Sequence, residues 1–331
     1  MQYTTLPRTD LEVSRVAMGC WALAGDMTWG PQDEAAGIAG IQAALDAGIN
    51  FFDTAELYGN GISEAMLGKA LCGMRDRAVI ASKFGPEHAS AGGVVTSCER
   101  SLQFLQTDRI DLYQIHWPSR KVPWEETWRA LEDLRDAGKI RYLAVSNFGD
   151  RDLQDLLRIG LPVSNQLPYS LITRMIEFDI LPQCIEHDIG VLCYSPLQHG
   201  LLTGKFRTAD DVPEGRARSR HFSCRRRLTR HGEAGCEEQT FAAVDRLCRI
   251  GEELGRTPTD VAMAWLLAQP GVSSVVVGVR SPEQARANAA ATDLQLDEAT
   301  LTALTESSEP VKQALGRNPD MWEGEAKSRY R

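Results

Sequence analysis

The chain lacks any apolar run of about 18 residues, the length that a membrane-spanning helix requires. Its first residues, MQYTTLPRTDLEVSRVAMG, also lack the charged start, long apolar stretch and small-residue cleavage site of a secretion signal. We therefore expect a cytoplasmic protein that does not enter a membrane. The 8 cysteines include no CxxC pair and lie mostly in apolar contexts, a pattern typical of reduced thiols.

An excess of positive charge is also missing. The 331 residues carry 36 Lys and Arg against 45 Asp and Glu, a formal net charge of −9. This balance argues against broad binding to nucleic acid or to an anionic membrane. With 43% hydrophobic and 24% charged residues, the chain can bury a large core, which excludes extensive disorder. Nothing in the composition indicates an oligomeric state.

No glycine-rich nucleotide motif is complete. GNGISE, residues 59–64, has the first two glycines of the dinucleotide fingerprint but a glutamate in place of the third small residue. GLLTGKF, residues 200–206, has three residues instead of four between its glycines and lacks the Ser or Thr of a phosphate loop. The alternative fold for this chain, a doubly wound open sheet, thus lacks its expected signature.

Short apolar runs alternate with segments of helical periodicity. After a possible hairpin that pairs 3–6 with 11–13, the predicted strands are 16–23, 49–55, 78–84, 110–117, 140–148, 163–170, 190–197 and 272–279. The predicted helices are 33–47, 63–71, 94–105, 124–137, 150–159, 174–187, 237–254, 258–269 and 282–290. Eight strands, each followed by a helix, predict an α/β fold, a (β/α)8 TIM barrel that residues 1–331 form as a single domain. An extra helix and a basic loop are expected between strands seven and eight.

Polar side chains stand at the carboxyl ends of the predicted strands, where barrel enzymes carry their sites. Asp53, Lys83 and His116 end strands two, three and four, and Tyr58 follows Asp53 in a loop. A lysine ammonium beside a phenol lowers the pKa of the tyrosine, and a buried aspartate would hold that lysine charged. His116 could donate a hydrogen bond to the same substrate carbonyl. Taken singly, each residue is more often structural; their joint placement is less easily accidental and is compatible with proton transfer to a carbonyl oxygen, although it does not by itself name the reaction.

Several segments resemble, in order and spacing, motifs of the aldo-keto reductase superfamily. They are FFDTAELYG, VIASKFG, IDLYQIHWP, AVSNF, NQLPYS, YSPLQHGLLTGKF and VGVRSPEQARAN, which together span residues 51–288. The resemblance implies a (β/α)8 barrel and the reduction of aldehydes and ketones with NADPH or NADH. It implies that Tyr58 is the general acid, that Lys83 and Asp53 support it, and that His116 orients the substrate.

The same resemblance implies a nicotinamide cofactor site. Ser146, Asn147 and Gln166 resemble the residues that bind the carboxamide, and Tyr194 resembles the aromatic residue on which the ring stacks. The further cofactor-binding residues implied are Trp21, Ser195, Pro196, Leu197, Gly200, Lys205, Arg216, Gly278, Arg280, Gln284 and Asn288. Ser281 is expected to cap the last helix, and Arg280 beside it could pair with a phosphate, which favours NADPH over NADH.

One basic segment stands out in this acidic chain. RARSRHFSCRRRLTRH, residues 216–231, holds seven arginines and two histidines and no acidic residue. Two interpretations are favoured: a solvated loop, or contacts from some of Arg216, Arg218 and Arg220 to the pyrophosphate or to an anionic substrate group. Nucleic-acid binding is the weakest alternative, because one arginine-rich stretch without a binding fold is little evidence for it. A metal site can be drawn from His221, Cys224, His231 and Cys236. Their spacing fits no zinc pattern, so no metal is predicted.

The sequence therefore predicts an NADPH-dependent reductase that transfers hydride from nicotinamide C4 to an aldehyde or ketone, with Tyr58 as proton donor. The basic segment favours a sugar-derived or otherwise polar aldehyde, hence a role in carbohydrate metabolism. The predicted substrate-binding residues are Trp21, Tyr58, His116 and Trp117. Two alternatives remain: an NAD-dependent alcohol or aldose dehydrogenase of the same fold, and a regulatory binding module that retains cofactor with negligible turnover.

Overall fold

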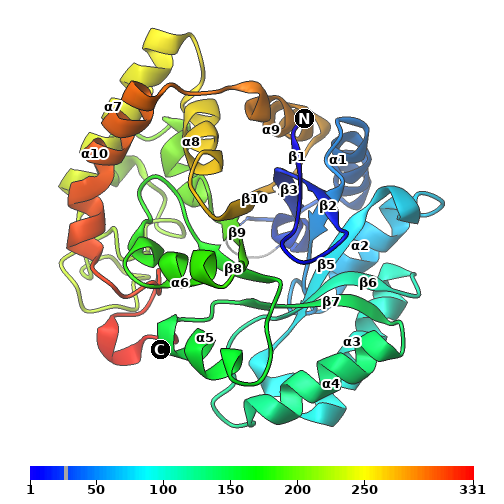
Figure 1. Cartoon of the computed structure of the whole chain (residues 1–331). Coiled ribbons are helices and arrows are strands. Elements are labelled where there is room, and N and C mark those ends of the chain that lie inside the picture. The colour runs from blue at the N-terminus through cyan, green and yellow to red at the C-terminus, as the bar shows by residue number, and fades with distance from the viewer. Residues whose placement is uncertain (26–28) are drawn as a thin grey trace.

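Eight parallel strands close into a barrel that helices surround (Figure 1). The structure is a computed structural model that describes residues 1–25 and 29–331. The barrel strands are β3 (Val16–Gly19), β4 (Phe51–Asp53), β5 (Val79–Phe84), β6 (Ile110–Ile115), β7 (Ile140–Ser146), β8 (Ser164–Pro168), β9 (Gly190–Tyr194) and β10 (Val272–Gly278). Each strand pairs with its neighbour in sequence, and β10 pairs with β3 to close the ring. The predicted (β/α)8 barrel is confirmed.

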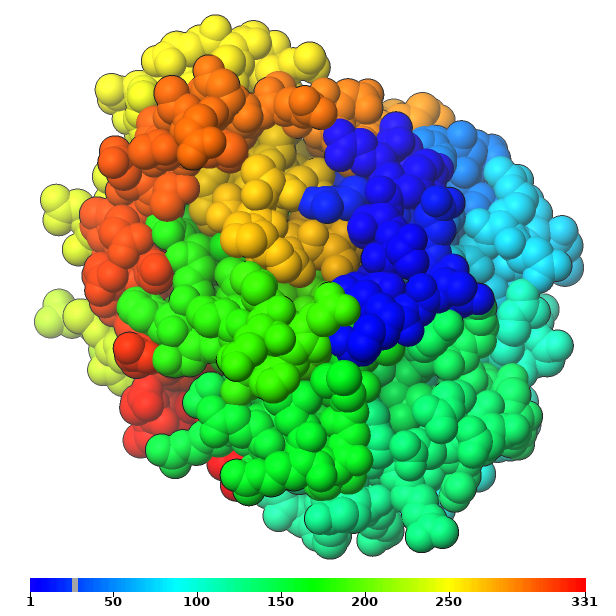
Figure 2. All heavy atoms as spheres, viewed as in Figure 1, coloured from blue at the N-terminus to red at the C-terminus, as the bar shows by residue number. Residues whose placement is uncertain are grey.

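The predicted hairpin is also present, as β1 (Tyr3–Thr5) and β2 (Glu12–Ser14). Its Leu6, Leu11 and Val13 are buried against side chains inside the barrel. Those partners are Ala17, Phe51, Ala81, Leu112, Ala144, Leu192 and Val276. Figure 2 shows the blue N-terminal segment lying across this face of the molecule. The hairpin therefore covers the amino-terminal end of the barrel, which leaves the carboxyl ends of the strands for a site.

Helices form the outer layer. They are α1 (Glu34–Asp46), α2 (Ile62–Ala70), α3 (Ala91–Leu105), α4 (Trp124–Asp136), α5 (Asp150–Leu157), α6 (Ile180–Glu186), α7 (Glu237–Leu254), α8 (Pro258–Leu267), α9 (Pro282–Ala290) and α10 (Glu298–Leu315). All nine predicted helical segments are present, although α6 starts later because residues 175–177 form a separate 3-10 turn. Both α7 and α8 lie between β9 and β10, as expected. No helix of the described residues is long and apolar enough to cross a membrane.

The sequence reading missed α10. Its pattern is interrupted by Pro310, and its buried face consists of Leu304, Val311 and Leu315, spaced by seven and four residues. Figure 1 shows α10 (orange-red) beside α7 on the outer wall. This packing positions the segment that follows, residues 317–331, which returns to the carboxyl-terminal side of the barrel and reaches the site described next.

Candidate active site

The chain delivers Asp53 and Tyr58 to the same place by a tight turn. Asp53 is the last residue of β4, and the backbone N–H of Tyr58 donates to the carbonyl of Ala55. Gly61, with φ of 94°, then starts α2, and a Cβ at this position would lie only 2.3 Å from the ring of Phe104. A glycine is required there because an L side chain would collide and would strain the backbone. Gly61 is therefore a turn residue and not part of a nucleotide-binding loop, as the incomplete nucleotide motif indicated.

Lys83 joins Asp53 to Tyr58. Its Nζ donates to Oδ2 of Asp53 at 2.7 Å, to the hydroxyl of Tyr58 at 3.2 Å and to the carbonyl of Thr54 at 2.9 Å. The Lys83 side chain is completely buried, so its charge depends on these partners. Oδ1 of Asp53 in turn accepts from Gln166 at 2.7 Å. The three predicted residues are therefore in direct hydrogen-bond contact.

The electrostatics differ in one respect from the expectation. Burial raises the pKa of Tyr58 above its usual value, and the charge of Lys83 only opposes this shift. Burial disfavours the Lys83 ammonium, but the pKa of Lys83 is raised because the interactions with Asp53 and Tyr58 together outweigh that penalty. At neutral pH Tyr58 is thus a protonated phenol beside a fixed cation, which is the form that a proton donor needs.

Aromatic rings surround Tyr58. The His116 ring meets it edge to face with centroids 5.8 Å apart, and Trp21 stacks on it at 6.2 Å. Trp21 lies in a 3-10 turn (Trp21–Ala24), so the predicted strand 16–23 is too long at this end. Burial and the nearby charge of Lys83 lower the pKa of His116 well below 6.5, so the ring is neutral near pH 7. A neutral histidine can donate a hydrogen bond to a substrate oxygen.

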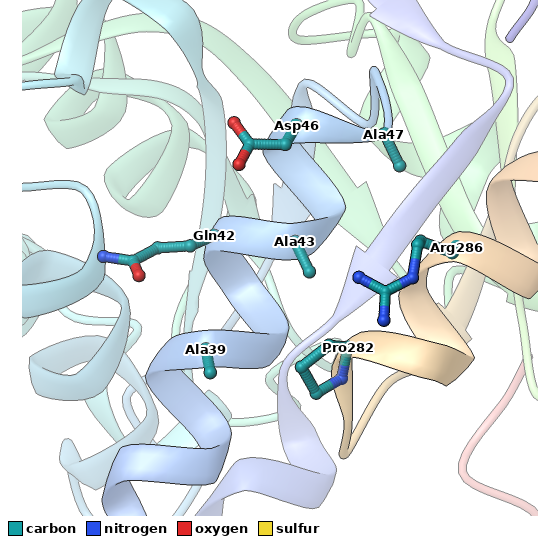
Figure 3. Close-up of a pocket in the computed structure, with 7 residues that line it drawn as sticks. All are labelled: Ala39, Gln42, Ala43, Asp46, Ala47, Pro282 and Arg286. Atoms are coloured by element: carbon teal, nitrogen blue, oxygen red, sulfur yellow. The ribbon is translucent and has the colours of Figure 1, made fainter.

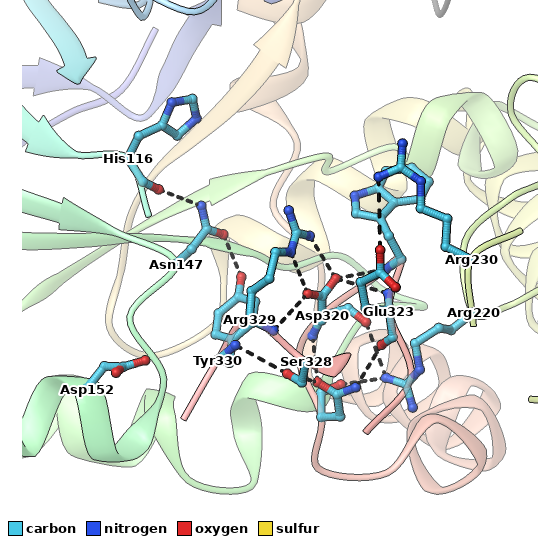
Figure 4. Close-up of polar contacts among 12 residues, drawn as sticks. His116, Asn147, Asp152, Arg220, Arg230, Asp320, Glu323, Ser328, Arg329 and Tyr330 are labelled. Carbon is cyan, nitrogen blue, oxygen red and sulfur yellow. Dashed lines mark hydrogen bonds and ion pairs between the residues drawn. The ribbon is translucent and has the colours of Figure 1, made fainter. Parts of the chain in front are cut away.

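Asn147 connects several predicted residues. Its Nδ2 donates to the carbonyl of His116 at 2.9 Å and to the hydroxyl of Ser146 at 3.0 Å. Its Oδ1 accepts from the hydroxyl of Tyr194 at 2.8 Å. The same Oδ1 accepts from the hydroxyl of Tyr330 at 2.5 Å (Figure 4). Tyr330 was missed from the sequence because no motif marks it. It is buried, and only the return of residues 317–331 to the barrel brings it here.

Gly200, Lys205 and Arg216 converge, as a pyrophosphate site would require. Gly200 has φ of 96°, and a Cβ there would lie 2.8 Å from Nζ of Lys205 and 3.7 Å from Nη1 of Arg216. Burial, with the charge of Arg216, lowers the pKa of Lys205. Within the part of the chain that the structure describes, no carboxylate pairs with either cation. Two like charges held together in this way suit an anionic group. The predicted Ser195, Pro196 and Leu197 lead from β9 into this turn.

The residues predicted at the adenosine end also lie together, but Arg280 has other partners. Its guanidinium donates to Oε1 of Gln32 at 2.9 Å and to the carbonyls of Trp29 and Pro31, both at 2.7 Å. Ser281 caps α9 as predicted, accepting from the N–H of Gln284. The side chain of Gln284 accepts from the N–H of Arg280, and Asn288 donates to the carbonyl of Gly278. Arg280 therefore ties the 29–32 segment to the end of β10.

The basic segment is not simply a solvated loop. Arg220 is buried, donates to the carbonyls of Leu315 and Asn318 at 2.6 Å each, and pairs with Glu233. It thereby anchors the start of residues 317–331. The buried His221 donates from Nε2 to the carbonyl of Ile172 at 2.7 Å.

The four residues weighed as metal ligands do not form a group of ligand atoms. Among the described residues, the one cluster with ligand atoms within 4.8 Å of one another is Glu56, Glu87 and His88. Glu56 already accepts from the N–H of Gly85 and from Arg100 and contacts His88. Its carboxylate is thus satisfied by protein groups.

One surface cavity lies apart from these residues, between α1 and α9 on the outer wall (Figure 3). It has a volume of about 420 Å³ and is lined by Ala39, Gln42, Ala43, Asp46, Ala47, Pro282 and Arg286. None of the predicted catalytic or cofactor-binding residues is among these lining residues. The chemistry-bearing residues thus belong to the carboxyl ends of the strands and not to this outer cavity.

Fold and site together give a barrel in which a tyrosine hydroxyl is hydrogen-bonded to a buried lysine and lies next to a neutral histidine, an arrangement suited to chemistry at a carbonyl oxygen. The sequence model of the aldo/keto reductase family matches residues 15–309. The chain therefore belongs to the aldo/keto reductase family, and it is an oxidoreductase of that family.

Named relatives agree over most of their length. The chain is 38% identical over 299 residues to the aldo-keto reductase YhdN of Bacillus subtilis (strain 168), covering 87% of each chain. It is 32% identical over 335 residues to the NADH-specific methylglyoxal reductase of Escherichia coli (strain K12), covering 94% of this chain and 100% of the relative.

Solved structures show the same fold. The glycerol dehydrogenase AKR11B4 of Gluconobacter oxydans superposes with a TM-score of 0.80 at 32% identity, covering 96% of this chain and 97% of that one. An aldo-keto reductase of Klebsiella pneumoniae in complex with NADPH superposes with a TM-score of 0.73 at 30% identity, covering 92% and 95%.

Proposed function

We propose that the protein is an NADPH-dependent reductase of small polar aldehydes and ketones, in which Tyr58 protonates the carbonyl oxygen. The observation that carries this proposal is the buried contact of Lys83 Nζ with Tyr58 at 3.2 Å and with Asp53 at 2.7 Å. A phenol that must release a proton needs a nearby cation to stabilise the phenolate, and that cation needs a counter-ion to stay charged when buried.

Each residue has a separate task in this mechanism. A bound reduced nicotinamide supplies the hydride that the carbonyl carbon receives. Tyr58 gives its proton to the carbonyl oxygen, so that the product is the alcohol. Lys83 stabilises the phenolate left behind, and Asp53 holds Lys83 in place. The neutral His116, edge to face with Tyr58, donates a hydrogen bond that orients the carbonyl.

The residues present fit a nicotinamide dinucleotide. Ser146, Asn147 and Gln166 would hold the carboxamide, with Tyr194 against the ring. Lys205 and Arg216, which converge over Gly200, would hold the pyrophosphate. NADPH is the proposed form because Arg280 has five N–H donors and gives three of them to the described residues, which leaves two for a 2′-phosphate. The Klebsiella relative was solved with NADPH, whereas the Escherichia relative is named NADH-specific.

The substrate proposal follows the names of two relatives. The chemistry described above accepts any reactive aldehyde. A methylglyoxal reductase and a glycerol dehydrogenase among the relatives indicate short, oxygen-rich compounds, and sugar-derived aldehydes belong to the same chemical class. We therefore propose short dicarbonyls and hydroxyaldehydes as first substrates to assay.

The decisive experiment replaces Tyr58 by Phe. We expect kcat for NADPH-dependent reduction of methylglyoxal to fall by about 100-fold or more, because the general acid is lost. The Kd for NADPH, followed by tryptophan fluorescence, should change less than about twofold. Tyr3→Phe, at an exposed tyrosine of the hairpin, is the matched control. Turnover in Tyr58→Phe within about twofold of the parent would overturn the role of Tyr58.

A second candidate function, alcohol oxidation, is favoured by the structural match to a glycerol dehydrogenase. The same residues would then work in reverse, with Tyr58 as the base. Measuring both directions with both cofactors at one pH separates the two. A regulatory module that only retains cofactor would instead show no hydride transfer in a single turnover with bound NADPH.

A further inference from the structure

A second surface cavity has a volume of about 490 Å³ and a mainly cationic lining. It is lined by Arg230, Glu323, Lys327 and Arg329. Three of these four side chains carry positive charge, in a chain whose formal net charge is −9. The cations come from two distant segments, the basic segment and residues 317–331, so only the tertiary structure assembles them.

Arg329 links this cavity to the catalytic residues. Its guanidinium lies 3.8 Å from the centre of the Trp117 ring, and Trp117 directly follows His116. The next residue, Tyr330, packs against Trp117 with ring centroids 5.3 Å apart and donates to Asn147. The positive charge of Arg329 also contributes to lowering the pKa of His116. Arg329 therefore lies within electrostatic reach of the residue proposed to orient the carbonyl.

The Arg329 side chain is held in a defined position. Its Nε and Nη2 donate to the two carboxylate oxygens of the buried Asp320 at 2.7 and 2.8 Å (Figure 4). Asp320 is itself fixed, because it accepts from the backbone N–H groups of Trp322 and Glu323. Within the described residues no acceptor binds Nη1 of Arg329, and Arg329 is one of the residues that line the cavity. A fixed guanidinium with a free edge is prepared to bind an anion.

The charge balance indicates the kind of anion. Glu323 forms a loose pair with Arg230 at 4.0 Å, and Asp320 pairs with Arg329. Lys327 is exposed and has no ion-pair partner among the described residues. Three cations against these two carboxylates leave one net positive charge. A monoanionic carboxylate matches this balance, whereas a phosphate dianion would exceed it.

We propose that this cavity binds a carboxylate at the far end of the aldehyde substrate, and that Arg329 is the specificity-determining residue for it. This inference rests on the proposed reductase function and adds a substrate class, aldehydes that bear a carboxylate several atoms from the carbonyl. Trp117, which contacts Arg329 and follows His116 in the sequence, would provide an apolar surface for the connecting part of such a substrate.

The test compares two aldehydes of the same shape, 4-carboxybenzaldehyde and 4-carbamoylbenzaldehyde. At low ionic strength we expect kcat/KM for the acid to exceed that for the amide by about tenfold, and the advantage to shrink as salt is added. In Arg329→Gln the ratio of kcat/KM for the acid to that for the amide should fall from about tenfold to about one, because both aldehydes then meet the same His116 without the guanidinium. Lys327→Gln should lower kcat/KM for the acid by about threefold without disturbing the ion pair between Arg329 and Asp320.

Two controls separate this inference from folding and from the proposed function. Arg158→Gln removes an exposed charge at the carboxyl end of α5 and should change kcat/KM for neither aldehyde. Binding of the unreactive alcohols 4-(hydroxymethyl)benzoate and 4-(hydroxymethyl)benzamide to the parent protein is measured by fluorescence. If neither aldehyde is reduced, the reductase proposal fails. The carboxylate site is still supported in that case if the parent protein binds the benzoate more tightly than the benzamide and Lys327→Gln weakens this preference. Equal affinity for the two alcohols, or equal kcat/KM for the two aldehydes, overturns the carboxylate site.

Discussion

The hydroxyl of Tyr330 donates a 2.5 Å hydrogen bond to Oδ1 of Asn147, although 183 positions separate the two residues. Tyr194 donates to the same oxygen, so Asn147 is held by two phenols on one side and by contacts to Ser146 and His116 on the other. Residues 317–331 therefore form part of the wall of the site. The orientation of a residue proposed to bind nicotinamide depends on a segment that no family motif includes.

Removing the Tyr330 hydroxyl should loosen this arrangement. In Tyr330→Phe we expect the Kd for NADPH to rise about three- to tenfold, because one hydrogen bond that orients Asn147 is lost. Tyr194→Phe should have an effect of the same size, and the double variant less than the product of the two, since both hydroxyls share one acceptor. Isothermal titration calorimetry measures these affinities. An unchanged Kd in Tyr330→Phe would show that Asn147 needs no support from this segment.

The paired cations Lys205 and Arg216 should respond differently with and without cofactor. Lys205→Gln relieves a like-charge contact, so the free energy of unfolding of the apoprotein should stay within about 0.5 kcal/mol or rise. The Kd for NADPH should increase about tenfold, with a weaker dependence on salt, because a pyrophosphate contact is lost. Lys69→Gln, on the exposed surface of α2, is the control. A large loss of stability together with an unchanged Kd would contradict an anion site here.

Asp53 and Lys83 should show strong energetic coupling. Asp53→Asn leaves the buried Lys83 ammonium without its counter-ion and should lower the free energy of unfolding by about 3 kcal/mol. Combining it with Lys83→Met should restore much of this loss, because no buried charge then remains. Urea denaturation of the four proteins completes the cycle. Additive losses would mean that the two side chains do not form an effective ion pair.

Substitutions at Arg280 and Gln32 distinguish a role of Arg280 in cofactor preference from a purely structural role. If its two remaining N–H groups bind the 2′-phosphate, Arg280→Ala should weaken NADPH by about tenfold more than NADH. Gln32→Ala removes only a contact to the 29–32 segment and should weaken both cofactors equally. Equal losses in Arg280→Ala would show that Arg280 acts only through that segment.

The buried His221 should make the folded protein less stable in mild acid. Burial lowers the pKa of His221 to about 4, whereas in the unfolded chain it titrates near 6.5. The folded state therefore resists protonation, so this stability is complete above about pH 6.5 and is lost as the pH falls towards 4. Between pH 7 and pH 5 the free energy of unfolding should fall by about 2 kcal/mol from this residue. His221→Gln should flatten the profile, and an unchanged slope would contradict a neutral buried imidazole.

Much of the site was predictable because it is encoded locally. Asp53, Lys83 and His116 each lie at or next to the carboxyl end of a strand, and neighbouring parallel strands bring these ends together, so strand order alone placed the three residues side by side. The caps, such as Ser281 before α9, were readable for the same reason. The predicted strands ran a few residues too long because apolar residues continue past the strand ends into the loops that line the site.

Other features were decided only by the tertiary structure. The pKa of Tyr58 is raised because desolvation outweighs Lys83, and burial is a property of the whole fold. Arg280 and Arg220 have partners that no spacing in the sequence could reveal. Sequence periodicity determined which elements form and in what order, since these depend on neighbours a few residues apart. The position of Arg329 and Tyr330 in the site was decided by packing between segments far apart in the chain, and a local pattern carries no record of such contacts.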